Sequence, residues 1–324
     1  MNVPNKSVLS LLCLLLACSA LAADRAAAPA GSAAELAQAE RYAKRCQKKV
    51  PERGQHPQGP QLWGTLSAWD EVGPDKDMRK SVLVSVSAAS LSKADVGRVL
   101  QGTSSEGQGV EVAICEAEVE GGEEEMTWYR VEAWNPVAQA WENPCKASGS
   151  MTRPRALAVG GVWDGSGAHQ QEKGKLTLAC EGGVISKCIG WGYKPWATQG
   201  GKSLAPLHQA CTRMARADYC GNGMSHTKEG NTIDMYDALG VQQPSTAASA
   251  GWEPARASFE AAWAPDGAVC LARTRDGKGL EEIEKECPGR FTKGEAVEMG
   301  QGERCTLKRA GESLQGAVLK NRGY

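Results

Sequence analysis

The sequence predicts an α+β fold in which β-rich antiparallel sheets pack with one main helix at about residues 203–218, and in which disulfides staple the chain. Short segments of alternating apolar and polar residues recur along the chain, a pattern typical of half-buried strands. Glycine is abundant, with 38 residues, and Trp outnumbers Phe by 10 to 2, which favours turns and strands over a helical bundle. The third observation is the count of 12 cysteines.

Most of the expected strands follow residue 80, where β-branched and aromatic residues alternate with polar ones. Residues 176–180 and 184–189 flank a Glu-Gly-Gly turn, so we expect them to pair as a hairpin. Residues 256–263 and 267–273 flank Pro-Asp-Gly and predict a second pair of strands, followed by a short acidic helix at 279–287. Earlier strands are expected at residues 82–88, 110–114, 126–134 and 156–162.

The main helix is predicted from apolar residues at helical spacing. Ser203 can cap its start, and Pro206 lies in the first turn, where a missing N–H group costs nothing. Asp218 falls on the same face as the buried apolar residues, so its carboxylate should be withdrawn from water. A buried carboxylate needs donors, and the nearest are the N–H groups of residues 220–223 and the side chains of Arg213 and Arg216.

The N-terminus predicts export. Residues 1–23 combine a positive start, a short apolar stretch and a small-residue cleavage site, which is the pattern of a signal peptide. An alternative stays open, because Leu15–Cys18 resembles a bacterial lipobox in which Cys18 would carry lipid. The apolar stretch is too short for an integral membrane span. We therefore expect a secreted, periplasmic or outer-membrane-associated protein.

The rest of the chain divides into an N-terminal tether and helix at 24–60, a main domain at 61–310 and a C-terminal tail at 311–324. The helix should start at a capping box formed by Ser32 and Glu35 and run for about four to five turns. Within the main domain we expect a β part at about 80–180 and a second part, carrying most of the distinctive motifs, at about 181–290.

Ten cysteines remain after the leader, an even number in a chain expected to be exported, so all ten should form disulfides. Their connectivity cannot be read from the sequence. Cys211 and Cys220 are nine residues apart along the expected helix, about 12–14 Å, so each should bond to another partner. The ten are Cys46, Cys115, Cys145, Cys180, Cys188, Cys211, Cys220, Cys270, Cys287 and Cys305.

Several motifs carry a family resemblance. The run Ala217–Cys220 reads Ala-Asp-Tyr-Cys, residues 187–196 read KCIGWGYKPW, and residues 211–214 read CTRM. On these motifs, and on further matches at Ser225–Thr227, Ile233–Asp237 and Ala262–Cys270, the chain resembles the ADYC domain family of bacterial proteins over roughly residues 100–290. The resemblance implies no particular activity, substrate or cofactor.

The composition and motifs exclude several classes of function. A formal net charge of −1 gives no field to attract nucleic acid, and phosphate-cradling loops are missing. No spacing typical of metal ligands or of a nucleophilic serine elbow occurs, so we expect no cofactor and no metal. A binding or structural role towards an envelope or extracellular ligand is our first hypothesis. Candidate ligand contacts for flat-faced molecules such as sugars are Trp191, Tyr193, Lys194 and Trp196.

The alternative hypothesis is an envelope hydrolase that uses Asp218, His226 and Asp234. Convergence of these three side chains in an open pocket would favour the enzyme. Burial of Asp218 under backbone donors would favour the binding or structural module, with His226 expected on an exposed loop.

Overall fold

The computed structural model describes residues 32–47, 84–104, 107–121, 126–145, 153–227, 231–249, 251–300, 303–311 and 316–324. Two compact units are present, Met1–Arg41 and Tyr42–Tyr324. The predicted leader, including Cys18, lies outside the described residues. In the part of the chain that is described, no helix has the length and apolar character needed to cross a membrane.

Helix α1, Ala33–Ala43, starts at the predicted capping box. The Ser32 N–H group donates to the Glu35 carboxylate at 2.6 Å, and the Glu35 N–H group donates to Ser32 Oγ at 3.3 Å. The helix is shorter than the four to five turns expected. Within the second unit, Cys46 has a left-handed backbone, with φ of 59°, and its N–H group donates to Glu132, so the chain has already left the helix there.

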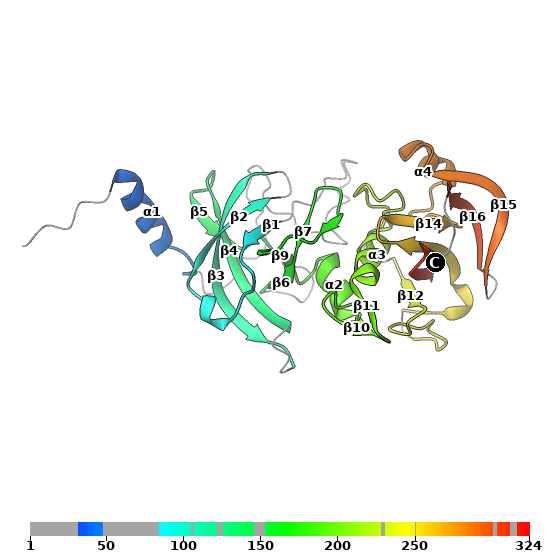
Figure 1. Ribbon diagram of the computed structural model, residues 1–324, viewed down its shortest axis with the longest axis horizontal. Coiled ribbons are helices and arrows are strands. Elements are labelled where there is room, and N and C mark those ends of the chain that lie inside the picture. The colour runs from blue at the N-terminus through cyan, green and yellow to red at the C-terminus, as the bar shows by residue number, and fades with distance from the viewer. Residues whose placement is uncertain are drawn as a thin grey trace, which may run out of the picture. The chain divides into compact units, whose positions relative to one another are not determined.

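The first sheet has seven antiparallel strands in the order β3-β2-β1-β9-β6-β4-β5, and an additional pairing of β3 with β4 closes it on itself (Figure 1). This closure removes most free edges, which a sheet must otherwise protect. Alternate side chains fill the interior, among them Val86, Ile114, Tyr129 and Leu178. The strands are β1 Val84–Ser87, β2 Val99–Ser104, β3 Gly109–Val119, β4 Thr127–Asn135, β5 Ala140–Glu142, β6 Ala156–Gly160 and β9 Lys175–Cys180.

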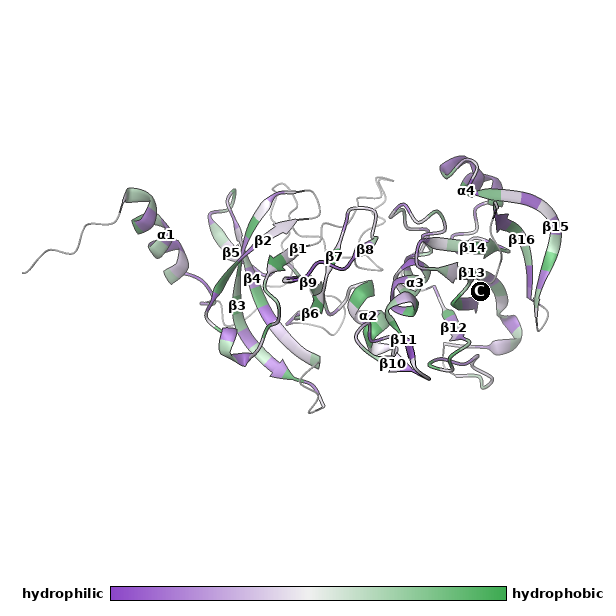
Figure 2. Cartoon of the chain, viewed as in Figure 1, coloured by the Kyte–Doolittle hydropathy of each residue, from purple (hydrophilic) through white to green (hydrophobic). Residues whose placement is uncertain are grey.

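The segment after β9 corrects one prediction. Residues 184–190 form helix α2, Val184–Gly190, and not the second strand of a hairpin. Val184, Ile185, Cys188 and Ile189 are all buried, and their spacing of one, three and one residues puts them on one helical face. The short apolar run is compatible with the period of a strand or of a helix, and packing against α3 favours the helix. Figure 2 shows apolar residues covering α2, whereas the short helix α4, Leu280–Glu286, is mainly polar.

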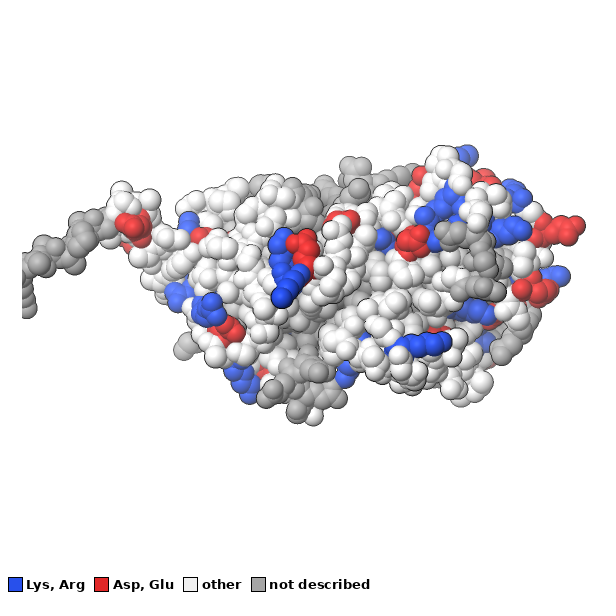
Figure 3. Space-filling model, viewed as in Figure 1, with Lys and Arg blue, Asp and Glu red and all other residues white. Residues whose placement is uncertain are grey.

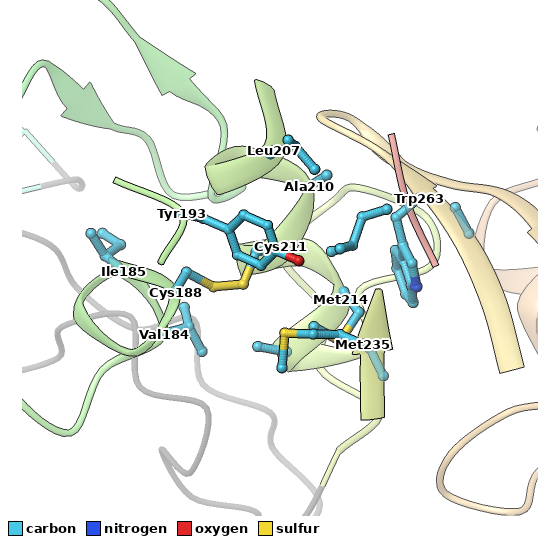
Figure 4. Close-up of a cluster of buried hydrophobic side chains, with 14 of the residues drawn as sticks. Val184, Ile185, Cys188, Tyr193, Leu207, Ala210, Cys211, Met214, Met235 and Trp263 are labelled. Atoms are coloured by element: carbon cyan, nitrogen blue, oxygen red, sulfur yellow. A yellow bond between two sulfur atoms is a disulfide. The ribbon is translucent and has the colours of Figure 1, made fainter. Parts of the chain in front are cut away.

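Helix α3, Ala205–Arg216, is the main helix predicted from the sequence. It contacts α2 on one side and the second sheet on the other. Met214 on α3 lies near Trp263 and Met235, and the Cys188–Cys211 disulfide joins α2 to α3 beside Tyr193 (Figure 4). Two small ribbons flank the helices: β7 Val162–Trp163 with β8 His169–Gln170, and β10 Thr198–Gln199 with β11 Lys202–Ser203.

The second sheet has six antiparallel strands in the order β12-β17-β13-β14-β16-β15. Its β17 falls within the stretch predicted as a C-terminal tail; β17 lies between β12 and β13 and pairs with both. The expected strand pair around Pro265–Gly267 is confirmed as β13 and β14. The strands are β12 Ile233–Asp237, β13 Ser258–Ala264, β14 Gly267–Leu271, β15 Phe291–Gly300, β16 Glu303–Arg309 and β17 Leu319–Gly323.

All ten cysteines after the predicted leader form disulfides, as the even count predicts. Cys211 and Cys220 bond to different partners, which confirms the distance argument made from the helix. Three of the bridges lie in the second half of the chain: one joins α2 to α3, one joins the segment after α3 to the end of α4, and one joins β14 to β16 within the second sheet. The pairs are Cys46–Cys115, Cys145–Cys180, Cys188–Cys211, Cys220–Cys287 and Cys270–Cys305.

We expect no free thiol among the ten cysteines that follow the predicted leader. Titration of the denatured but unreduced chain with a thiol reagent should therefore find fewer than about 0.2 thiols per molecule, and reduction should release ten. Two or more thiols before reduction would contradict the oxidised state.

Candidate functional site

The signature turn, Ala217–Gly223, begins where α3 ends. Ala217 adopts a left-handed conformation, with φ of 52° and ψ of 40°, and its N–H group bonds the carbonyl groups of Arg213 and Met214. The helix therefore ends at Arg216, two residues before the predicted end at Asp218. Ala217 is fully buried, so a small side chain suits this position.

Asp218 lies at the centre of the signature turn, and its side chain is 0% exposed. Its Oδ1 accepts the N–H group of Asn222 at 3.1 Å, and its Oδ2 accepts the N–H group of Gly223 at 3.0 Å. Arg213 Nη1 donates to Oδ2 at 2.6 Å. The turn residues and Arg213 are the donors expected from the sequence. The carboxylate thus holds the turn closed and balances a buried guanidinium.

Glycines let the signature turn pack on the β13–β14 turn. Gly221 has φ of +69°, and a Cβ atom there would lie 1.9 Å from the carbonyl oxygen of Asp266. Gly267 has φ of +120°, and a Cβ atom there would lie 2.8 Å from the carbonyl oxygen of Tyr219. Any larger side chain at either position would force the two turns apart.

Tyr219 connects the signature turn to the second sheet. Its ring stacks on Trp263 with centroids 5.3 Å apart, and its hydroxyl donates to Glu260 at 3.1 Å while it accepts the N–H group of Arg275 at 2.7 Å. Burial, followed by the charge of Glu260, raises the pKa of Tyr219 well above its usual range. The phenol therefore stays neutral and acts as a hydrogen-bonding strut.

Glu260 and Arg275 form a buried ion pair that sequence reasoning missed. Arg275 Nη2 lies 2.8 Å from Glu260 Oε1, and the same guanidinium donates to the carbonyl groups of Met214 and Ala215 at the end of α3. Arg275 thereby donates to two carbonyl groups in the last turn of α3, where intrahelical partners run out. The sequence does contain one sign of this pair, because Glu260 is the single carboxylate among the apolar residues of 259–264.

The sequence suggested that His226 lies on an exposed loop. This prediction is wrong, because His226 is buried and only 5% exposed. Its Nδ1 lies 3.1 Å from Asp276 Oδ2, and its Nε2 lies 2.8 Å from Glu286 Oε2. Burial alone would lower the pKa of His226, but the hydrogen bonds and charges of Asp276 and Glu286 outweigh it and raise the pKa to about 9. The imidazolium is therefore a cationic bridge between two segments, 50 and 60 residues further along the chain.

The three hydrolase candidates have separate sets of partners. Asp234 on β12 accepts Arg322 Nε at 2.9 Å, the N–H group of Ser245 at 3.0 Å and its hydroxyl at 2.8 Å. Within the described residues, no hydrogen bond joins any two of Asp218, His226 and Asp234. Each of the three side chains is therefore held by partners of its own.

The candidate ligand contacts divide into a buried and a surface group. Tyr193 is fully buried, and its hydroxyl donates to Asp237 at 3.0 Å, so it serves the core. Trp191 is partly buried, and its carbonyl group accepts Gln242 Nε2 at 2.7 Å. Trp196 is 38% exposed, and Lys194 is half-buried beside it in sequence.

One group of side chains has the spacing of a metal site in the part of the chain that the structure describes: Cys46, Cys115 and Glu132, whose ligand atoms lie within 4.8 Å of one another. The two sulfur atoms are bonded to each other as a disulfide, so they are not available as thiolate ligands. Glu132 accepts the N–H group of Cys46 at 2.7 Å. The group therefore carries no metal assignment.

Fold and site together define a disulfide-stapled, β-rich α+β protein whose signature residues serve as anchors. The family model of the ADYC domain matches residues 93–277, more than half of the chain, and the chain belongs to the ADYC domain family. Each signature residue now has a physical role: Ala217 turns the chain, Asp218 binds the turn, Tyr219 braces the sheet and Cys220 bonds Cys287. No curated protein and no solved structure matches the chain.

We expect Asp218→Asn to lower the free energy of unfolding by about 1–3 kcal/mol. The amide can still accept one hydrogen bond, but the charge-assisted contacts to Arg213 and to the turn are weakened. Urea unfolding followed by fluorescence measures the change. The matched control is Glu298→Gln, which breaks an exposed ion pair with Arg304 and should change stability by less than about 0.5 kcal/mol. Equal effects of the two variants would contradict an anchoring role for Asp218.

The His226 bridge should make stability depend on pH. Because the pKa of His226 is raised to about 9 from 6.5 in the unfolded chain, its stabilisation is complete below about pH 6.5 and is lost as the pH rises through 9. Asp276 and Glu286 have lowered pKa values, so their part is lost as the pH falls below about 4. From the rise in the pKa of His226, the free energy of unfolding should fall by on the order of 2–3 kcal/mol between pH 6.5 and 10.

His226→Gln is the variant that tests this pH dependence. It should flatten the stability curve between pH 6.5 and 10 and lower the plateau near pH 6, which urea unfolding at a series of pH values would show. A variant whose curve keeps the parent's alkaline slope would place the titrating group elsewhere.

Proposed function

We propose that the chain is an exported binding or structural module of the cell envelope or extracellular space. The five disulfides support this location, because such bonds persist in oxidising compartments and are rare in the cytosol. The leader pattern of residues 1–23 points the same way, and lipid attachment at Cys18 is the alternative route to the same compartment.

The observation that carries the binding role is an exposed tryptophan on a braced loop. The aromatic loop, Trp191–Ser203, connects α2 to α3, and the Cys188–Cys211 disulfide ties these two helices together with a Cα–Cα distance of 5.9 Å. The N–H group of Leu204, the residue after the loop, bonds the carbonyl group of Ala197 within it, and β10 pairs with β11. The loop is therefore held at both ends and across its middle.

A rigid aromatic side chain loses little conformational freedom when a ligand stacks on it, so more of the contact energy is retained as affinity. Trp196 supplies such a face, and Lys194 on the same loop supplies a cation for a polar group of the ligand. The ligand class is a flat-faced molecule such as the sugar ring of an envelope polysaccharide. Tyr193, which the sequence grouped with these residues, acts as the loop's anchor through Asp237.

The contacts of the hydrolase candidates support binding over catalysis. A general base needs a free lone pair, but both ring nitrogens of His226 face carboxylates, and its pKa of about 9 keeps it protonated at neutral pH. Asp218 is fully withdrawn from water. Asp234 is bound by Arg322 and Ser245.

We expect the purified mature protein to co-sediment with insoluble envelope polysaccharide, with purified peptidoglycan as the probe, and Trp196→Ala to weaken this binding at least about tenfold. Val137→Ala is the matched control, because Val137 is an exposed apolar residue in the first half of the chain, 58% exposed. Its binding should equal the parent's. Absence of sedimentation by the parent, or unchanged binding by Trp196→Ala, would overturn the assignment of the aromatic loop.

A further inference from the structure

The β10–β11 ribbon forms the projecting part of the aromatic loop. Its two strands are antiparallel, and Thr198 on β10 lies directly opposite Ser203 on β11. Gly200 and Gly201 connect the strands with φ of +55° and +75°, so a tight turn fixes the register of the ribbon. Among the described residues, no atom beyond the chain neighbours lies within 4 Å of a Cβ atom built on either glycine. The tip of the ribbon is therefore open to a ligand.

The two faces of this ribbon have different surroundings. Ala197 packs against the buried core and accepts the N–H group of Leu204, which is itself buried. Successive side chains alternate between the two faces of a strand pair, so Thr198 and Ser203 point away from the core. Both are exposed, and so is Trp196, which precedes Ala197. The outer face of the ribbon thus presents two hydroxyl groups close to the exposed tryptophan.

The hydroxyl groups of Thr198 and Ser203 can both bind a ligand. Among the described residues, the Thr198 hydroxyl has no hydrogen-bond partner. Ser203 Oγ accepts the N–H group of Ala205 at 3.2 Å, which leaves its O–H group to donate. The Cβ atoms of directly opposed residues in an antiparallel pair lie about 4.5–5.5 Å apart, so two such hydroxyl groups can contact neighbouring polar groups of one molecule.

Charged side chains do not belong to this outer face. Lys202 precedes Ser203 and therefore points to the other face, together with Gln199 opposite it. Residues 184–217 contain no Asp or Glu. Figure 3 shows charged side chains of both signs in small groups, with uncharged surface between them on the face in view. The outer face of the ribbon thus offers neutral hydrogen-bonding groups.

We propose that Thr198 and Ser203 bind the polar edge of the sugar ring that stacks on Trp196, and that this edge carries neutral hydroxyl or acetamido groups. The inference rests on the binding role proposed for the aromatic loop and adds the residues that select the ligand. A sugar ring has an apolar face and a polar edge, which an aromatic side chain and a few fixed polar groups match together. Stacking tolerates many flat molecules, whereas paired hydroxyl groups discriminate against a ligand that lacks their partners.

Co-sedimentation of the full mature protein with purified peptidoglycan tests the contribution of the ribbon. Thr198→Val keeps the shape of the side chain and removes its hydroxyl group, so it should weaken binding about threefold to tenfold. Thr198→Ser keeps a hydroxyl group at this position and should recover most of the lost binding. A purely structural role for Thr198 would not depend on the hydroxyl group in this way.

Gln199→Ala is the matched control, because Gln199 is exposed on the same strand but points to the other face. Its binding should equal the parent's, and thermal unfolding should show that all the variants are folded. If the parent does not sediment, or if Trp196→Ala binds as the parent does, the function proposed for the aromatic loop is wrong and this inference is wrong with it. Weaker binding by Trp196→Ala with unchanged binding by Thr198→Val overturns this inference alone. Equal losses in Thr198→Val and Gln199→Ala also overturn it, because binding would then show no preference for the outer face.

Discussion

The second half of the molecule depends on the cost of burying two carboxylates. Asp218 and Glu260 are both withdrawn from water, and an unpaired charge in such a place would cost several kcal/mol. Arg213 pairs with Asp218, and Arg275 pairs with Glu260. Both arginines also donate to backbone carbonyl groups. Two buried ion pairs thus join α3, the signature turn and the second sheet, and the loss of one charge of a pair would destabilise the fold. Removal of either partner would leave the other buried without its counter-charge.

Short carboxylate side chains organise loops elsewhere in the chain in the same way. Asp237 accepts the N–H groups of Leu239, Val241 and Gln242, and Asp164 accepts those of Ser166 and Ala168. These loops lack the backbone ladders of strands, so the carboxylate takes the place of a repeating partner. These carboxylate contacts and the five disulfides together fix the geometry of the loops around the apolar core of this Gly-rich chain. The aromatic loop depends on the same device, since Asp237 also holds Tyr193.

Contacts between neighbours in sequence could be predicted, and those between distant residues could not. The donors of Asp218 lie within five residues of it, so the helix pattern and the following turn were enough to name them. The partners of His226 are Asp276 and Glu286, and no local pattern connects them. Strand β17 was not predicted, for a different reason. Asn321 faces inward and accepts a hydrogen bond from Trp263 Nε1 at 2.8 Å. The buried face of β17 is therefore partly polar, and the sequence shows no alternation of apolar and polar residues there.

The span that matches the family model does not contain all the partners of its own signature residues. The match ends at residue 277, whereas Cys220 bonds Cys287 and His226 reaches Glu286. Strand β17, which separates β12 from β13 in the sheet, lies further along the chain. In this chain the signature turn is therefore completed by α4 and the C-terminal strands. We therefore expect the matched span and the segment that follows it to unfold as one cooperative unit, because the disulfide, the ion pairs and the sheet all cross the end of the matched span.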